Sequence, residues 1–295
     1  MAARTIAGLV DAVAIRSPSK LALLSPFQSS QKFTYEELST STNALAGWLS
    51  LYGYERGDLL VSDLPNVSEN LMLQIACNRL GVVYATAKNI EAMAKFPKVK
   101  GAISTNGKGF LAETNLPLPF LDGEMLQGLI HGGGLDSFQD ESFDIGELNT
   151  THAHYNSTAA YTNQMALEQG EDAAFRLSMS EEDVVCVSIT LCHAFGIGSA
   201  VSSALTRGAT IALPAVGGIQ GCGVPSKRAE ATLEVLENEK CTLMFADTHT
   251  LKALPEPPHD LALRGGVCKI GSGSTFLDET RSYCGVSLLT MGKKE

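Results

Sequence analysis

The sequence has no apolar run long enough for a membrane-spanning helix. Such a helix needs about 20 consecutive apolar residues, and Gly, Ser or a charged side chain interrupts every apolar stretch sooner. We therefore expect no direct membrane span. Positive charge is also scarce, since 22 Lys and Arg stand against 32 Asp and Glu. Phosphate backbones are bound by clustered Lys and Arg, so the net charge of −10 argues against a nucleic-acid partner.

Paired cysteine motifs are absent as well. The seven cysteines are scattered, odd in number, and include no Cys-x-x-Cys pair. This pattern favours reduced, mostly buried thiols over a disulfide framework or a zinc site. His152 and His154 do not change this, because side chains two positions apart at a helix start face different directions. We predict no metal site.

Short apolar runs alternate with segments of helical periodicity in both halves of the chain. The expected strands are residues 59–61, 82–85, 184–189, 209–213 and 241–245, and the expected helices are residues 34–49, 69–80, 156–167, 197–205 and 227–239. Strands that alternate with helices through short links pair in parallel by helical crossovers. The sequence therefore predicts an α/β fold with mixed or parallel sheets flanked by helices.

Residues 104–149 separate the two halves, because they are rich in Gly, Pro and acids and have little periodicity. We predict a first α/β subdomain at residues 1–103, an irregular connecting segment at 104–149, and a second α/β subdomain at 150–295. Residues 1–20 are basic and amphipathic, with two possible interpretations. They are either a targeting helix or the first helix of the fold, and we favour the second.

Several motifs then follow one another in a characteristic order. Residues 190–196 read Thr-Leu-Cys-His-Ala-Phe-Gly and residues 205–214 read Leu-Thr-Arg-Gly-Ala-Thr-Ile-Ala-Leu-Pro. The other motifs lie at residues 33–38, 57–58, 64–66, 79–84, 263–264, 271–273 and 292–295. Together they resemble the large N-terminal domain of the AMP-forming acyl-CoA synthetases and adenylating enzymes. No counterpart of that family's C-terminal lid domain follows them in this sequence.

The resemblance implies positions for a former substrate pocket. By this resemblance, the pocket residues are His193, Phe195, Gly196, Gly271, Ser272, Gly273 and Glu295. The first three would line the acyl or nucleotide pocket, the next three would meet the adenine, and Glu295 would hold magnesium. A core histidine beside a helix start remains an alternative for His193.

The phosphate-binding loop of the family has no clear match. The family places a Ser/Thr/Gly-rich loop with a Lys before a Thr-His pair, which corresponds here to Thr151-His152. Residues 136–146 contain no Lys, one Gly and four acids, which would repel a triphosphate. Residues 131–134, His-Gly-Gly-Gly, are interpreted as a turn. We therefore assign no catalytic residue and expect no cofactor, although the family uses ATP or AMP, magnesium and CoA.

Three functions remain open on this basis. The first is a catalytically inactive, acyl-CoA synthetase-like protein that acts as a structural or accessory subunit of a larger complex. Its partners would be other protein subunits, in mitochondria or alternatively in the cytoplasm. The second is a non-catalytic module that binds acyl-CoA, a fatty acid or AMP. The third is an active ligase fragment that works with a separate lid chain.

Overall fold

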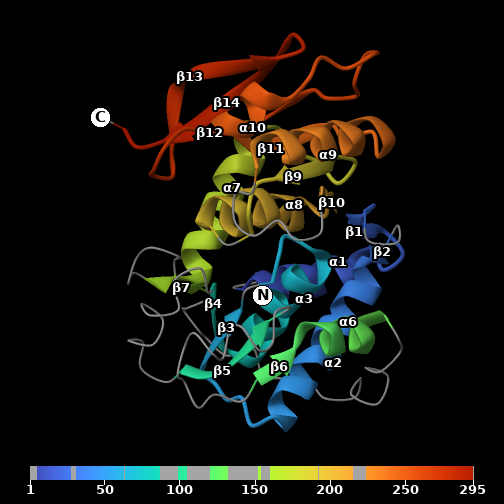
Figure 1. The fold of residues 1–295 in the computed structure, drawn as a ribbon, viewed down its shortest axis with the longest axis vertical. Helices are drawn as coiled ribbons and strands as arrows, with labels where there is room; N and C mark the ends of the chain where they lie inside the picture. The colour runs from blue at the N-terminus through green and yellow to red at the C-terminus, as the bar shows by residue number, and fades with distance from the viewer. Residues whose placement is uncertain are drawn as a thin grey trace. The chain divides into compact units, whose positions relative to one another are not determined.

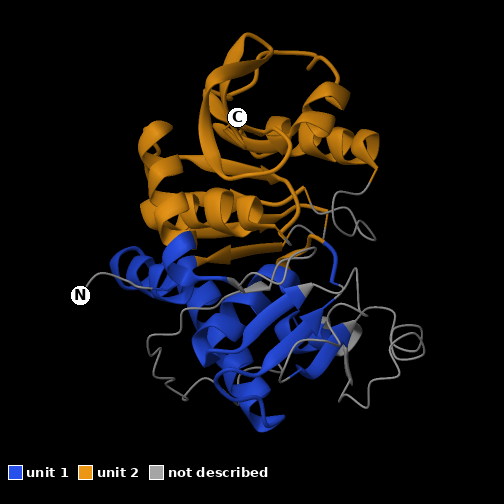
Figure 2. Cartoon of the chain, turned by 90° about the vertical axis from the view of Figure 1, so that its left-hand side faces the viewer, with its two compact units in different colours: residues 1–19, 35–65, 69–165 blue, residues 20–34, 66–68, 166–295 orange. Residues whose placement is uncertain are grey.

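The computed structural model has an α/β architecture. It describes residues 5–27, 31–62, 64–86, 99–104, 120–131, 152–153, 160–191, 193–214 and 224–294. The chain divides into two compact units (Figure 2). Unit 1 comprises residues 1–19, 35–65 and 69–165, and unit 2 comprises residues 20–34, 66–68 and 166–295.

These units differ from the predicted subdomains at several places. Residues 66–68 belong to unit 2 and residues 150–165 to unit 1. Residues 20–34 lie early in the sequence but also belong to unit 2. The reason is strand pairing, since β1 (Leu21–Ser25) pairs in parallel with β10 (Thr210–Ala212), far along the chain. Local periodicity carries no information about such a distant partner, so the sequence alone assigned this segment to the first subdomain.

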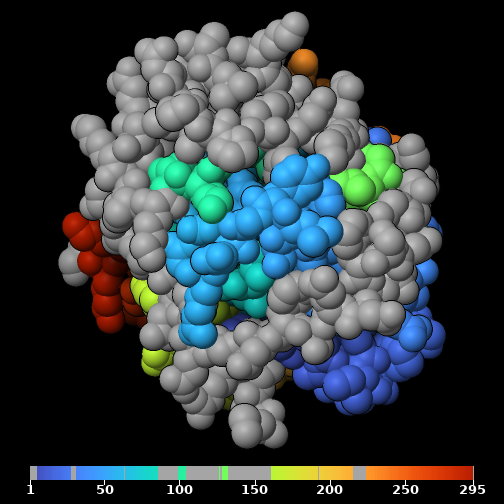
Figure 3. Space-filling model, turned by 90° about the horizontal axis from the view of Figure 1, so that it is seen from below, coloured from blue at the N-terminus to red at the C-terminus, as the bar shows by residue number. Residues whose placement is uncertain are grey.

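Unit 1 is built on a sheet with the order β6-β5-β3-β4-β7-β8. Its strands are β3 (Leu59–Ser62), β4 (Val83–Thr86), β5 (Val99–Ser104), β6 (Phe120–Asp122), β7 (His152–Ala153) and β8 (Ala160–Tyr161). Its helices are α1 (Ile6–Arg16), α2 (Tyr35–Leu51), α3 (Ser68–Leu80) and α6 (Gly123–His131). Part of this unit's surface is seen in Figure 3. Leu51, the last residue of α2, and the following Tyr52 are exposed.

Helix α1 shows why the basic N-terminal segment belongs to the fold. The hydroxyl of Thr5 accepts a hydrogen bond from the N–H of Gly8 at 2.9 Å, which caps the helix. Ile6, Val10 and Val13 are buried at helical spacing. Residues 5–16 therefore form the first helix of the fold, which is the interpretation of residues 1–20 that the sequence favoured.

Unit 2 is built on a larger sheet with the order β13-β14-β12-β11-β9-β10-β1-β2. The strands not yet given are β2 (Gln31–Thr34), β9 (Val184–Ser188), β11 (Leu243–Asp247), β12 (Gly265–Lys269), β13 (Thr275–Tyr283) and β14 (Val286–Gly292). Its helices are α7 (Asn163–Arg176), the π-helix η2 (Phe195–Val201), α8 (Ser202–Arg207), α9 (Pro225–Asn238) and α10 (Thr248–Ala253). The inner strands are parallel, and β13 and β2 pair antiparallel at the two edges.

Strand β9 is the point where the strand order of unit 2 reverses. The chain passes from β9 through η2 and α8 to β10 on one side, and then through α9 to β11 on the other. Right-handed crossovers in opposite directions put α8 and α9 on opposite faces of the sheet. Figure 1 shows β9 between these two helices.

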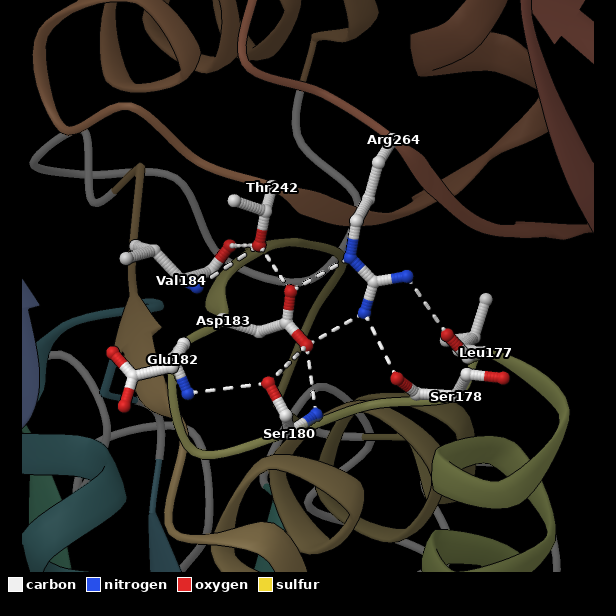
Figure 4. A network of polar contacts seen from close by, with 8 residues as sticks. All are labelled: Leu177, Ser178, Ser180, Glu182, Asp183, Val184, Thr242 and Arg264. Atoms are coloured by element: carbon white, nitrogen blue, oxygen red, sulfur yellow. Dashed lines mark hydrogen bonds and ion pairs between the residues drawn. The ribbon is translucent and has the colours of Figure 1, made fainter.

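A polar cluster joins the amino ends of three parallel strands in unit 2 (Figure 4). Asp183 precedes β9, Thr242 precedes β11, and Arg264 precedes β12. Oδ1 of Asp183 accepts from Nε of Arg264 at 2.9 Å and from Oγ1 of Thr242 at 2.6 Å, and Oδ2 accepts from Nη2 of Arg264 at 2.6 Å. These bonds fix the three strands side by side at their amino ends.

Two details of the predicted secondary structure need correction. The helix predicted at residues 156–167 is wrong at its start, because Ala160–Tyr161 forms β8 and α7 begins at Asn163. The cause is antiparallel pairing of β8 with β7, a tertiary contact. The segment predicted to be irregular, residues 104–149, contains β6 and α6.

Candidate functional site

The candidate site lies at the carboxyl ends of the parallel strands of unit 2. In open α/β sheets, ligands bind outside these ends at the point where the strand order reverses. Here that edge is formed by the segments that follow β9, β11, β12 and β14. The predicted pocket residues that the structure describes lie on two of these segments, the one after β9 and the one after β12.

Residues 193–196 turn the chain from β9 into η2. The carbonyl of His193 accepts hydrogen bonds from the N–H groups of Gly196 at 2.9 Å and Ile197 at 3.1 Å. A Cβ on Gly196 would lie 2.1 Å from the carbonyl oxygen of Thr190, so only glycine fits. His193 is half-buried. The glycine of the predicted motif therefore has a steric role in this turn.

Phe195 contributes to the core. Its side chain is 2% exposed, and its ring centroid lies 5.8 Å from that of Phe245 on β11, at an interplanar angle of 52°. Such a tilted pair is a favourable aromatic packing geometry. The structure thus gives Phe195 a packing role at a position where the resemblance implies a pocket wall.

Asn66 holds the backbone that leaves β9. Its amide nitrogen donates to the carbonyl of Ile189 at 2.8 Å, and its amide oxygen accepts from the N–H of Leu191 at 2.7 Å. The sequence indicated only that residues 64–66 form a turn before a helix. The hydrogen bonds join this turn to a strand end more than a hundred residues later.

The second predicted group, residues 271–273, is an exposed glycine turn after β12. Gly271 and Gly273 have φ of +54° and +85°, a region that favours glycine. A Cβ on Gly273 would lie 2.6 Å from the carbonyl oxygen of Gly292, which ends β14. The turn is therefore packed against the end of β14. Ser272 is exposed in this turn, and Glu295 lies outside the described residues.

A buried ion pair at the end of β11 was not found from the sequence. Arg228 on α9 is 4% exposed and donates from Nη2 to Oδ2 of Asp247 at 3.1 Å and from Nε to Oγ1 of Thr250 at 2.8 Å. Oδ1 of Asp247 accepts from the N–H of Thr250 at 2.7 Å and so caps α10. An Asp directly after an apolar strand is a capping signal that local reasoning could have used.

Lys269 is a second group that sequence reasoning missed. It ends β12, is half-buried, and donates from Nζ to the carbonyl of Gly273. Burial disfavours the charged form and lowers the pKa of Lys269 to about 8. An ionisable side chain with a shifted pKa at this edge of the sheet is a candidate functional residue.

The described residues include neither a metal-binding cluster nor a membrane-spanning helix. Among them, no group of three or more His, Cys, Asp or Glu side chains is arranged to hold a metal. No helix formed by these residues has the length and apolar character needed to cross a bilayer. The described polar groups at the candidate edge include Lys269, His193 and the Arg228–Asp247 pair.

Comparison with known proteins gives consistent matches. Residues 10–90 match the family model described as AMP-binding enzyme. The chain is 24% identical over 318 residues to the medium-chain fatty-acid–CoA ligase of Escherichia coli, covering 93% of this chain and 52% of that protein. It is 39% identical over 56 residues to the acetyl-coenzyme A synthetase of Xanthobacter autotrophicus, covering 19% of this chain and 9% of that protein.

Solved structures give the same fold. The fatty acyl CoA synthetase of Mycobacterium tuberculosis has a TM-score of 0.73 at 15% identity, covering 92% of this chain and 56% of that one. The inhibitor-bound N-terminal domain of FACL13 from the same organism has a TM-score of 0.72 at 15% identity, covering 90% and 69%.

The fold is thus that of the N-terminal domain of acyl-CoA synthetase-type proteins, as the sequence predicted. The chain is similar to AMP-binding enzymes, whose family model matches residues 10–90, and to acyl-CoA ligases. It spans about half the length of the medium-chain ligase.

Proposed function

We propose that this chain is a catalytically inactive member of its family that acts as a structural or accessory subunit of a larger protein complex. The observation that carries the proposal is the composition of residues 136–146. They occupy the position of the family's phosphate-binding loop by resemblance, and they hold four acids, one Gly and no Lys. These residues lie outside the described part of the chain, so the argument rests on their chemistry.

Adenylation brings a carboxylate against a phosphate, and both are anions. The approach needs fixed positive charge and oriented N–H groups. Two like charges 4 Å apart repel by about 4 kcal/mol at an effective dielectric constant of 20. A loop with four acids opposes the approach of ATP, and an enzyme that had to bind ATP there would lose affinity.

The packing of Phe195 also supports a structural role. The resemblance implies that this residue lines a substrate pocket, yet its ring is 2% exposed and packs on Phe245. A buried ring contributes to stability through the area that it removes from water. The motif therefore has a physical reason to persist without substrate binding.

Calorimetric titration tests the loss of nucleotide binding. The chain is titrated with ATP and magnesium, with AMP, and with medium-chain acyl-CoA, and the full-length Escherichia coli ligase serves as the positive control. The proposal predicts no nucleotide binding tighter than millimolar and no need for a cofactor. A micromolar dissociation constant for ATP or AMP would contradict it.

Affinity purification tests the role as a subunit. The tagged chain is recovered from its own cells at low detergent, and native mass measurement gives the composition of the eluate. We expect protein partners at fixed stoichiometry. Recovery as a free monomer at physiological concentration would overturn the assignment to a complex.

The compartment is a separate part of the proposal. We propose a mitochondrial location, with the cytoplasm as the alternative. Fractionation of cells that express the untagged chain distinguishes the two. Co-sedimentation with mitochondrial matrix markers is expected, and recovery with cytosolic markers alone would assign the alternative.

Two other functions are tested by the same reagents. A module that binds acyl-CoA, a fatty acid or AMP is favoured by the half-buried cation Lys269 at the carboxyl edge of the sheet. It would show micromolar binding that Lys269→Ala weakens and Lys252→Ala leaves unchanged. An active ligase fragment that works with a separate lid chain would release pyrophosphate from ATP once that chain is supplied.

A further inference from the structure

Lys269 is placed at the carboxyl edge of the larger sheet by its neighbours in register. Its Cα is paired with that of Asp247 on β11 and with that of Met291 on β14. Its carbonyl oxygen accepts from Oγ1 of Thr248 at 2.9 Å. The backbone of Lys269 is thus held on both sides, which fixes the position of its Cα.

The ammonium group of Lys269 has no acidic partner in the described structure. No ion pair within 4.0 Å links Nζ to a carboxylate there, and its hydrogen-bond acceptor is the neutral carbonyl of Gly273. The carboxylate of Asp247, its register neighbour, is already bound to Arg228 and Thr250. A half-buried amine without a counter-charge favours its neutral form.

The other ionisable groups on adjoining elements do not offset this effect. Helix α10 carries His249 and Lys252, which are both exposed, and Lys293 follows β14 and is exposed. Strand β13 adds Asp278, Glu279 and Arg281 on its exposed part. Burial is the cause of the lowered pKa of about 8. At pH 7.5, about a quarter of Lys269 is then neutral, against about 0.1% of a lysine at the reference pKa.

The amine lies against an exposed turn. Nζ of Lys269 donates to the carbonyl of Gly273, and residues 271–273 are exposed. The carbonyl of Gly273 accepts one N–H, so the nitrogen lone pair of the neutral amine stays available. A neutral amine at the edge of an exposed turn can act as a nucleophile.

We propose that Lys269 is an acyl-acceptor site, modified on Nζ by small acyl thioesters without the help of an enzyme. The lone pair of Nζ attacks the thioester carbonyl carbon, a C–N bond forms, and the C–S bond breaks. The thiolate leaves with the electron pair, and the proton lost from nitrogen passes to the thiolate or to solvent. No oxidant or metal takes part, and the reaction needs neither nucleotide binding nor a protein partner.

The test compares Lys269 with an exposed lysine on the neighbouring helix. The full chain is incubated with acetyl-CoA at pH 6.5 to 9.0, and peptide mass spectrometry gives the acetylation rate at each site. At pH 7.5 we expect Lys269 to react about tenfold faster than Lys252, since partial burial and lower basicity reduce the advantage given by the neutral fraction. The rate at Lys269 should level off above pH 8, whereas the rate at Lys252 should keep rising.

Two variants complete the experiment. Lys269→Arg should remove the fast phase of total acetylation, and Lys252→Arg should leave that phase intact, with thermal unfolding confirming that both variants fold. Acetylation of Lys269 no faster than that of Lys252 would overturn the proposal. A rate at Lys269 that continues to rise in parallel with that at Lys252 through pH 9 would overturn it as well.

Discussion

The carboxylate of Asp183 and the guanidinium of Arg264 face each other in a two-point contact, with Nε to Oδ1 at 2.9 Å and Nη2 to Oδ2 at 2.6 Å. The two residues are far apart in sequence, yet each directly precedes a parallel strand of the same sheet. The contact therefore fixes the relative positions of β9 and β12 at their amino ends (Figure 4).

The Asp183–Arg264 contact predicts acid sensitivity. Burial raises the pKa of Asp183, but hydrogen bonds from Arg264, Thr242 and the Ser180 N–H outweigh it, and the net pKa is lowered. A carboxyl group with a lower pKa in the folded state stabilises the protein above its unfolded pKa, near 4. This contribution is lost as pH falls below that value through the folded pKa.

Asp183→Asn should cost about 2 kcal/mol at pH 7, because it breaks the charged contact and turns an acceptor into a donor. Urea unfolding at pH 7 and pH 3 measures the loss, which should shrink at the lower pH. Asp172→Asn removes the exposed pair with Arg176 and should cost less than about 0.5 kcal/mol. Equal losses for the two variants would contradict this account.

The turn after β9 predicts a strict need for glycine at position 196. Gly196→Ala would place a methyl group 2.1 Å from the Thr190 carbonyl oxygen, so the backbone must move. We expect a loss of about 3 kcal/mol or more, measured by thermal unfolding. Gly128→Ala on α6 meets nothing within 4 Å and should be neutral or stabilising by up to about 1 kcal/mol. An unchanged melting temperature for Gly196→Ala would refute the steric argument.

The hydrogen bonds of Asn66 predict that a substitution there also destabilises the segment after β9. Asn66→Ala removes the hydrogen bonds to the Ile189 carbonyl and the Leu191 N–H, and we expect a loss of about 1 to 3 kcal/mol. Hydrogen exchange at Leu191 should accelerate more than exchange in β12. Asn238→Ala, at the exposed end of α9, serves as the control and should change little. Unchanged exchange at Leu191 would show that the bonds do not hold this segment.

The effects of substitutions at Arg228 and Asp247 on stability should depend on each other, because the two side chains form a buried ion pair. Asp247→Asn keeps a capping oxygen for α10 but leaves the buried Arg228 charge uncompensated, so we expect a loss of about 3 kcal/mol. Arg228→Met in the same chain should recover much of it, because the unpaired charge is gone. Additive losses in the double variant, measured by urea unfolding, would exclude this coupling.

Local patterns predicted much of this fold because its strands and helices alternate and because glycine and proline mark where several of them end. Gly81 and Gly208, with φ of +77° and +72°, end α3 and the η2–α8 segment as expected from the sequence. The apolar run before Pro214 contains β10. These features depend on neighbours within a few residues, which a sequence displays directly.

The features that the sequence could not reveal depend on distant partners. β8 becomes a strand because β7 pairs with it, and residues 20–34 join unit 2 because β10 pairs with β1. Lys269 was missed for the same reason, since its burial depends on the arrangement of neighbouring strands. The predicted roles of His193, residues 271–273 and Glu295 in a former pocket remain predictions.

The most direct test of the inactive-enzyme account is ATP–pyrophosphate exchange, which reports the first half-reaction alone. The chain is incubated with ATP, magnesium, labelled pyrophosphate and a panel of fatty acids, with the full-length Escherichia coli medium-chain ligase as the active control. The account predicts exchange indistinguishable from a no-protein blank. Fatty-acid-dependent incorporation of label into ATP would contradict it.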